Sequence, residues 1–214
     1  VDAGGPLLLT LSARARRGLD ISPVPLNLAG KTAAQIEQIG IGSYLANGFA
    51  ECTSCHSPEP GPAKYFAGGV VFPIGPGQFV VSRNLTPDPA TGMKDTEDQF
   101  LQASRNGTDI LNTGQALIAH PWQHHRWLST YDLKAVYAFL QVIPPVNNSY
   151  PGDVKPPIPA LTFPGRYNEG VVERPLPPEV DTFGQPVPDP DNVLRGLAIV
   201  PVGGRSGLAG GAAV

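Results

Sequence analysis

The chain has 214 residues, of which 41% are hydrophobic, and it contains 25 glycines and 25 prolines. The hydrophobic fraction excludes a fully disordered chain, while the glycine and proline content indicates long irregular segments around a small folded core. The net charge of −3 and the pI near 5.8 give no reason to expect nucleic acid as a partner, because nucleic-acid binding favours basic surfaces.

The chain begins with an irregular segment, and a helix follows it. Residues 1–30 have no clear apolar period and contain several prolines, so we predict an extended N-terminal arm. From residue 31 the apolar side chains recur with a period near 3.6 residues, which predicts a helix over about 32–50. Gly42 inside this helix is tolerable if another helix packs closely there. Residues 57–92 are predicted to form a loop, because proline and glycine interrupt each short apolar run.

Two further helices carry clear signals at their ends. Thr96 and Gln99 have the spacing of a capping box, and Gly107 ends the helix that they begin. The last helix begins near Ser129 and presents apolar side chains at positions i, i+3, i+4 and i+7. A pair of prolines starting at Pro144 stops it.

The rest of the chain is dense in proline and glycine. Residues 147–214 show no periodic apolar face, so we predict an irregular C-terminal extension that builds no core of its own. The expected fold is therefore mainly α. It consists of a small helical domain over residues 31–146, flanked by two long irregular arms over 1–30 and 147–214.

Both cysteines of the chain lie in one motif, Cys52-x-x-Cys55-His56. This CxxCH pattern is typical of c-type haem attachment. Two thiols three residues apart can each bond one vinyl-derived carbon on the same porphyrin edge, and His56 then lies under the iron as its proximal ligand. The other ring N–H of His56 is expected to donate to a backbone carbonyl, which fixes the tautomer, and the Pro58–Pro62 loop offers candidate carbonyls.

Three other interpretations of the motif compete with the interpretation that it attaches one covalent haem c. A redox-active CxxC pair needs the strand and helix of a thioredoxin-like fold around it. A structural zinc site needs two more ligands, for which His120, His124 and His125 are the available histidines. A plain disulfide leaves His56 unexplained.

Several short blocks surround this motif. They are GSYLANG at 42–48, YFAGGVVFP at 65–73, SRNLTPDPATG at 82–92, YDLKAVYAFL at 131–140 and PPV at 144–146. Together they resemble the haem domains of dehydrogenase-linked cytochromes c, the subunits that serve membrane alcohol, gluconate and sorbitol dehydrogenases. The resemblance covers about residues 40–146 and implies a cytochrome c-like helical domain around one haem c.

The second axial ligand of the iron departs from this family. The resemblance implies a methionine within a Met-Pro-Trp or Met-Pro-Tyr block, but this chain has His-Pro-Trp beginning at His120. We therefore predict that His56 and His120 are the two metal ligands, with a lower potential than methionine-ligated relatives have. Met93, His124, His125 and an open sixth position remain alternatives.

Three further side chains are candidates for contacts with the haem. An indole N–H from Trp122, or a guanidinium from Arg126 or Arg83, would bind a propionate carboxylate, with charge assistance from the arginines. Packing away from the haem is the alternative for each.

These observations predict a carrier of single electrons and not an enzyme. No apolar run approaches the roughly 20 residues of a membrane helix, and the printed residues include no basic signal peptide, as is also expected if one has been removed. The resemblance implies haem attachment outside the cytoplasmic membrane, so a periplasmic or extracellular (cell-surface) location is expected. Expected partners are redox proteins, and the arms suggest contact with other copies, in an oligomer or filament, or with a dehydrogenase complex. The alternative is an open-iron haem protein that senses or reduces a gas or peroxide.

Overall fold

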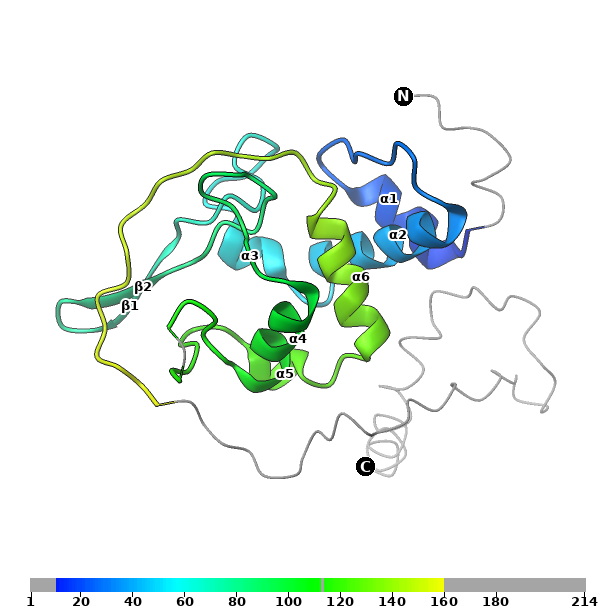
Figure 1. Cartoon of the computed structure of the whole chain (residues 1–214). Helices are drawn as coiled ribbons and strands as arrows, with labels where there is room; N and C mark the ends of the chain where they lie inside the picture. The colour runs from blue at the N-terminus through cyan, green and yellow to red at the C-terminus, as the bar shows by residue number, and fades with distance from the viewer. Residues whose placement is uncertain (1–10, 113, 160–214) are drawn as a thin grey trace, which may run out of the picture.

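The structure, a computed structural model, describes residues 11–112 and 114–159 (Figure 1). This part of the chain is mainly helical, as the sequence predicts, with one two-stranded antiparallel sheet. No helix in the described part is both long enough and apolar enough to cross a membrane. The elements in chain order are α1 (Ala13–Ile21), α2 (Ala33–Asn47), α3 (Cys52–His56), β1 (Val71–Gly75), β2 (Gln78–Val81), α4 (Glu97–Asn106), α5 (Trp122–His125) and α6 (Thr130–Leu140).

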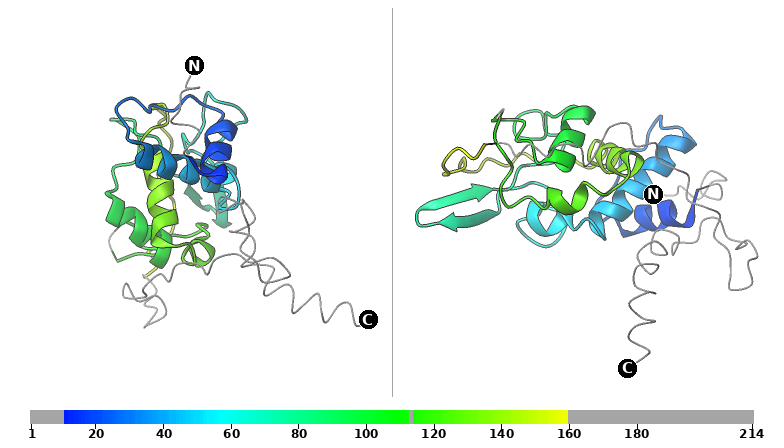
Figure 2. Two further views of the ribbon diagram at one scale, coloured as in Figure 1. Left: turned by 90° about the vertical axis from the view of Figure 1, so that its right-hand side faces the viewer. Right: turned by 90° about the horizontal axis from the view of Figure 1, so that it is seen from below.

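Helix α1 packs against α2, as Figures 1 and 2 show. The extended backbone predicted for residues 1–30 is therefore wrong for Ala13–Ile21. The two backbones nearly touch, since a Cβ on Gly18 would lie 1.8 Å from the carbonyl oxygen of Gly40. The buried face of α1 consists of Ala15 and Gly18, and such small side chains produce no apolar period that a sequence pattern can reveal.

Helices α2 and α6 form the centre of the core. A Cβ on Gly42 would lie 1.9 Å from the carbonyl oxygen of Ala135 in α6, which confirms that a second helix packs closely at this glycine. Leu45 of α2 and Phe139 and Leu140 of α6 are buried in the same apolar cluster. This close pair of helices forms the core of the domain, against which other segments pack.

The predicted ends of the two later helices are largely confirmed. The Thr96 side chain accepts from the Gln99 backbone N–H in a complete capping box at the start of α4, and Gly107 ends that helix with a φ of 66°. Ser129 caps α6. Helix α6 ends at Leu140, a few residues ahead of the first proline.

A β-hairpin projects from the helices (Figure 2). The loop predicted for residues 57–92 is wrong over Val71–Val81, where β1 pairs with β2 in antiparallel register. Gly77 makes the turn possible with a φ of 67°, a backbone conformation that glycine adopts at little cost. Pro73 lies within β1, and β1 tolerates it because the outer edge of this strand has no partner strand among the described residues.

Residues 147–159, called the strap below, follow α6 and cross the hairpin (Figure 1). The backbone of the strap is irregular, as predicted, but it is bonded to the domain. Phe79 and Val154 exchange two backbone hydrogen bonds of 2.8 and 2.9 Å, and Ala116 donates to the carbonyl of Ile158 at 2.9 Å. The remainder of the predicted C-terminal arm, residues 160–214, lies outside the described residues, as do residues 1–10.

Candidate functional site

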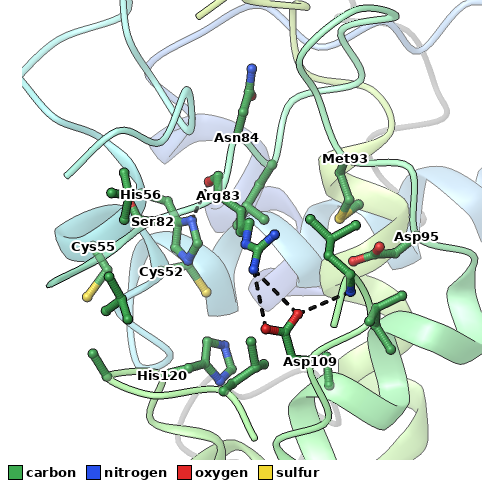
Figure 3. A pocket seen from close by; sticks show the side chains of 18 of the residues that line it. Cys52, Cys55, His56, Ser82, Arg83, Asn84, Met93, Asp95, Asp109 and His120 are labelled. Atoms are coloured by element: carbon green, nitrogen blue, oxygen red, sulfur yellow. Dashed lines mark hydrogen bonds and ion pairs between the residues drawn. The ribbon is translucent and has the colours of Figure 1, made fainter. Parts of the chain in front are cut away.

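The CxxCH motif forms α3, a helix of 5 residues that follows α2 closely. Glu51 starts it with a left-handed φ of 49°. Residues three apart in a helix lie on the same face, so Cys52 and Cys55 both face one cavity. Figure 3 shows their sulfur atoms at one side of this cavity, with the ring of His56 beside them.

The cavity has a volume of about 640 Å³, within the roughly 300–1,000 Å³ typical of cofactor and ligand sites. Much of its wall is apolar, with contributions from the hairpin, α4 and α6. The apolar lining residues include Phe72, Val80, Val81, Leu85, Phe100, Leu117, Ile118, Leu128, Leu133, Val136 and Leu140. An apolar enclosure of this kind excludes water and strengthens electrostatic interactions inside it.

The ring of His56 is fixed by one hydrogen bond. Its Nδ1 lies 2.7 Å from the backbone carbonyl oxygen of Arg83. A carbonyl only accepts, so Nδ1 carries the proton and Nε2 keeps a lone pair. Enclosure away from water lowers the pKa of His56 to about 4, which keeps the ring neutral. The predicted bond to a backbone carbonyl is present, but the acceptor is Arg83 and not the Pro58–Pro62 loop.

His120 enters the same cavity from the loop ahead of α5 (Figure 3). Burial, with smaller contributions from the charges of His125 and His56, lowers its pKa to about 3. The Nδ1 atom of His120 is buried and has no hydrogen-bond partner among the residues that the structure describes. A buried polar atom without a partner costs about 1–3 kcal/mol, and coordination to a metal would satisfy such a nitrogen.

The segment that carries His120 is held at both ends. Ala119 has a φ of 61°, a left-handed conformation that is uncommon for alanine and marks a constrained backbone. On the other side, the ring of His125 packs edge-on against His120 with centroids 5.3 Å apart. Nε2 of His125 lies 3.2 Å from the carbonyl oxygen of Ala50, two residues before the first cysteine.

Comparisons with known proteins agree with this geometry. The chain is 34% identical over 166 residues to the gluconate 2-dehydrogenase cytochrome c subunit of Pantoea cypripedii, covering 74% of this chain and 34% of the relative. It is 35% identical over 102 residues to the cytochrome c subunit of alcohol dehydrogenase (quinone) from Gluconobacter oxydans, covering 46% and 20%. This chain is a relative of dehydrogenase cytochrome c subunits.

A further relative belongs to another dehydrogenase. A nicotinate dehydrogenase subunit from Pseudomonas putida is 32% identical over 137 residues, which cover 63% of this chain and 11% of that protein. The chain thus spans about a third of the gluconate dehydrogenase subunit and less of the other two. No family model matches the chain.

Relationship to cytochrome c subunits implies haem c as the cofactor, and the cavity fits such a group in three respects. It is large enough and mainly apolar, Cys52 and Cys55 both reach it, and two neutral imidazoles enter it. His56 presents a free lone pair, and His120 has a buried nitrogen in need of a partner. These residues are able to hold a porphyrin and its iron.

The alternative ligands are placed differently. Met93 lines the cavity and packs against the core cluster, and Figure 3 shows it across the cavity from the cysteines. His125 lines the cavity as well, but its Nε2 is near the Ala50 carbonyl. His124 is exposed and does not line the cavity.

Two of the residues predicted to contact the haem, Trp122 and Arg126, do not line the cavity. Pro121 is the N-cap of the short helix α5. This helix turns the side chains of Trp122 and Arg126 into the protein, where both are buried. The Trp122 indole covers Gly107, and the Arg126 guanidinium lies 5.9 Å from the Trp122 ring centroid. The third candidate, Arg83, does line the cavity.

The competing interpretations of the motif find little support in the geometry. Among the described residues, no group of three or more histidine, cysteine, aspartate or glutamate side chains is able to hold a metal ion. Burial raises the pKa of Cys52 to about 12, whereas redox-active CxxC pairs depend on a lowered thiol pKa. A zinc site and a thioredoxin-like pair are therefore both disfavoured.

Sequence reasoning missed a charged cluster on the cavity wall. Asp109 lies between Arg83 and Lys155, at N–O distances of 3.4 and 3.7 Å. Lys155 belongs to the strap, far from Asp109 in the sequence, so no local pattern connects the two residues. The sequence offered one hint of this cluster, namely that Asp109 follows closely after Gly107, where the helix was predicted to end.

Proposed function

We propose that this chain carries one haem c, bonded to Cys52 and Cys55, and that it transfers single electrons. His56 and His120 are the proposed axial ligands. The observation that carries the proposal is the pair of neutral imidazoles in the cavity of the CxxCH motif, one fixed by a carbonyl and one with an unpartnered buried nitrogen. When bound, the iron supplies one-electron chemistry by cycling between its ferrous and ferric states.

The contacts around the two histidines favour them over Met93. His56 is held by the Arg83 carbonyl, and His120 is held by the ring of His125 and by its own backbone. Met93 already has a role as a flexible apolar side chain against the core.

A bis-histidine site supports electron transfer and not catalysis. Two protein ligands leave no position on the iron for a substrate, a gas or a peroxide. The mainly apolar wall limits contact of the metal with water, so little solvent has to reorganise when one electron arrives or leaves. An open-iron function would need His120 to be displaced.

The proposed setting follows from the relatives and not from the fold. A periplasmic or cell-surface location is proposed, with redox proteins as donors and acceptors and a dehydrogenase complex as one such partner. Contact with other copies through the arms is a separate proposal, and it rests mainly on residues outside the described part of the chain.

Electron paramagnetic resonance of the oxidised, haem-loaded chain tests the ligand set. We expect a low-spin bis-histidine signal and no thioether-to-iron absorption band in the far red. His120→Met should introduce that band and raise the reduction potential, because methionine ligation raises it. His124→Met is the matched control, since His124 is exposed and outside the cavity.

The possible outcomes separate the alternatives. A thioether band in the unmodified chain that disappears in Met93→Leu assigns the ligand to Met93 and refutes His120. A high-spin signal with rapid carbon monoxide binding supports the open-iron alternative instead.

A further inference from the structure

The charged cluster of Arg83, Asp109 and Lys155 lies on the wall of the cavity, and Figure 3 shows Arg83 and Asp109 between the two cysteines on one side and Met93 and Asp95 on the other. The Asp109 side chain is 2% exposed, and the Lys155 side chain is 7% exposed. Charged side chains are rarely buried to this extent unless they have charged or polar partners. All three residues line the cavity, so their charges act on whatever occupies it.

Asp109 is well satisfied without its two cations. Its carboxylate accepts from the backbone N–H groups of Leu111 and Asn112 at 3.1 and 3.2 Å, and from the Asn112 side chain at 2.9 Å. The distances to Arg83 and Lys155, 3.4 and 3.7 Å, are longer than the roughly 2.7–2.9 Å of a tight charge-assisted hydrogen bond. Asp109 therefore holds both cations at the wall while neither forms a close pair with it.

The cations keep donor capacity for a second anion. An ammonium group has three donors, and Lys155 has a further contact to the side-chain oxygen of Gln115 at 3.3 Å. Arg83 has a second carboxylate nearby, that of Asp153 at 3.8 Å, but Asp153 is 20% exposed and accepts from the Val81 N–H. It therefore offsets the charge of Arg83 only weakly.

Asp95 also lines this cavity. Burial raises its pKa, and the charge of Asp109 raises it further, while Arg83 acts in the opposite direction. A carboxyl with a raised pKa adds less negative charge and is able to donate a hydrogen bond when protonated. Lys155 and Arg83, with Asp95 adding little negative charge, thus suit this wall of the cavity to a carboxylate.

We infer that Lys155 and Arg83 together bind the two propionate carboxylates of the haem, with Asp109 holding both cations in position. This inference rests on the proposed function, because attachment at Cys52 and Cys55 fixes the vinyl-derived edge of the porphyrin. The propionates lie on the opposite edge, and Lys155 and Arg83 offer them two cations on the wall of the same cavity.

The strap is therefore part of the cofactor site, although the sequence places the haem domain within residues 31–146. Val154, next to Lys155, is bonded to Phe79 in both directions, and Ile158 accepts from Ala116. These bonds fix the backbone on both sides of Lys155 before the ligand is bound, which lowers the entropy cost of using so long a side chain.

The experiment uses the full haem-loaded chain with Lys155→Met, which keeps the length of the side chain and removes its charge. Lys134→Met is the matched control, because Lys134 is 40% exposed and pairs with Glu97 outside the cavity. The reduction potential and the propionate bending band of the resonance Raman spectrum are measured for each.

Loss of a cation beside the propionates favours the ferric state. We expect Lys155→Met to lower the potential by at least about 28 mV, a threefold change in a one-electron equilibrium at 59 mV per tenfold. We also expect its propionate band to move, while Lys134→Met leaves both unchanged. If Lys155→Met does not fold, Lys155→Gln, which also removes the charge but keeps a polar side chain, should give the same two shifts.

The contrary outcomes are distinct. A lower potential with an unmoved propionate band means that Lys155 only balances Asp109, and it refutes the carboxylate contact. No change in either measurement refutes any role of Lys155 at the haem. If the loaded chain shows no low-spin haem, the proposed function fails and this inference fails with it, whereas low-spin haem with an unchanged Lys155→Met refutes the inference alone.

Discussion

Gly68 controls both the stability of the fold and the setting of His56. It has a φ of 66°, and a Cβ placed on it would lie 2.4 Å from the carbonyl carbon and 2.5 Å from the carbonyl oxygen of Arg83. This oxygen is the acceptor for His56 Nδ1. In Gly68→Ala the left-handed backbone costs about 1–2 kcal/mol, and the overlap costs about 1–3 kcal/mol more. We expect a total loss of about 2–5 kcal/mol in the free energy of unfolding.

Gly30→Ala isolates the contact from the backbone conformation. Gly30 has a φ of 71°, and a Cβ added to it would have no atom of the described residues within 4 Å. In Gly30→Ala only the left-handed backbone conformation therefore lowers the stability, by about 1–2 kcal/mol. Urea unfolding of both variants, monitored by circular dichroism, gives the difference. If Gly68→Ala is no more destabilising than Gly30→Ala, the Arg83 segment moves freely and the reasoning is wrong.

The same pair of variants reports on the proximal ligand. A ring N–H that donates to a carbonyl makes the imidazole a more basic ligand, and a more basic ligand favours the ferric state. Displacing the Arg83 carbonyl in Gly68→Ala should therefore raise the reduction potential of the haem-loaded chain, and Gly30→Ala should leave it unchanged. An unchanged potential in Gly68→Ala would show that the His56–Arg83 bond persists.

Two further predictions concern the cavity. His125→Phe removes the bond to Ala50 and keeps a ring beside His120, so we expect the low-spin signal of the haem to persist but broaden. His124→Phe is the control and should leave this signal unchanged. Loss of the low-spin signal in His125→Phe would instead make His125 the ligand. For Asp95 the folded state raises the carboxyl pKa, so Asp95 lowers stability as pH rises above its unfolded pKa of about 4. Urea titrations should therefore find Asp95→Asn more stable than the parent at pH 7 and equal to it at pH 3, and equal stability at both pH values would contradict the shift.

The local features of this fold were predictable, because they depend on neighbours in the sequence. The capping box at Thr96 and the glycine stop at Gly107 each involve side chains within one helical turn. Helix α1 was not predicted, because its buried face consists of Ala15 and Gly18. The stability that such small residues add to the fold depends on how closely α2 approaches them. The hairpin was not predicted because its strands are short and because Pro73 and Gly75 interrupt the apolar run of β1.

The sequence by itself determined the chemistry of the site, since the CxxCH motif and the His-Pro-Trp block name the cofactor type and the candidate ligands. Only the tertiary structure decided which groups support them. It assigned the acceptor for His56 to Arg83, turned Trp122 and Arg126 away from the cavity, and brought Lys155 to Asp109. These contacts join segments distant in the chain, and packing of the whole domain sets them, so no local pattern encodes them.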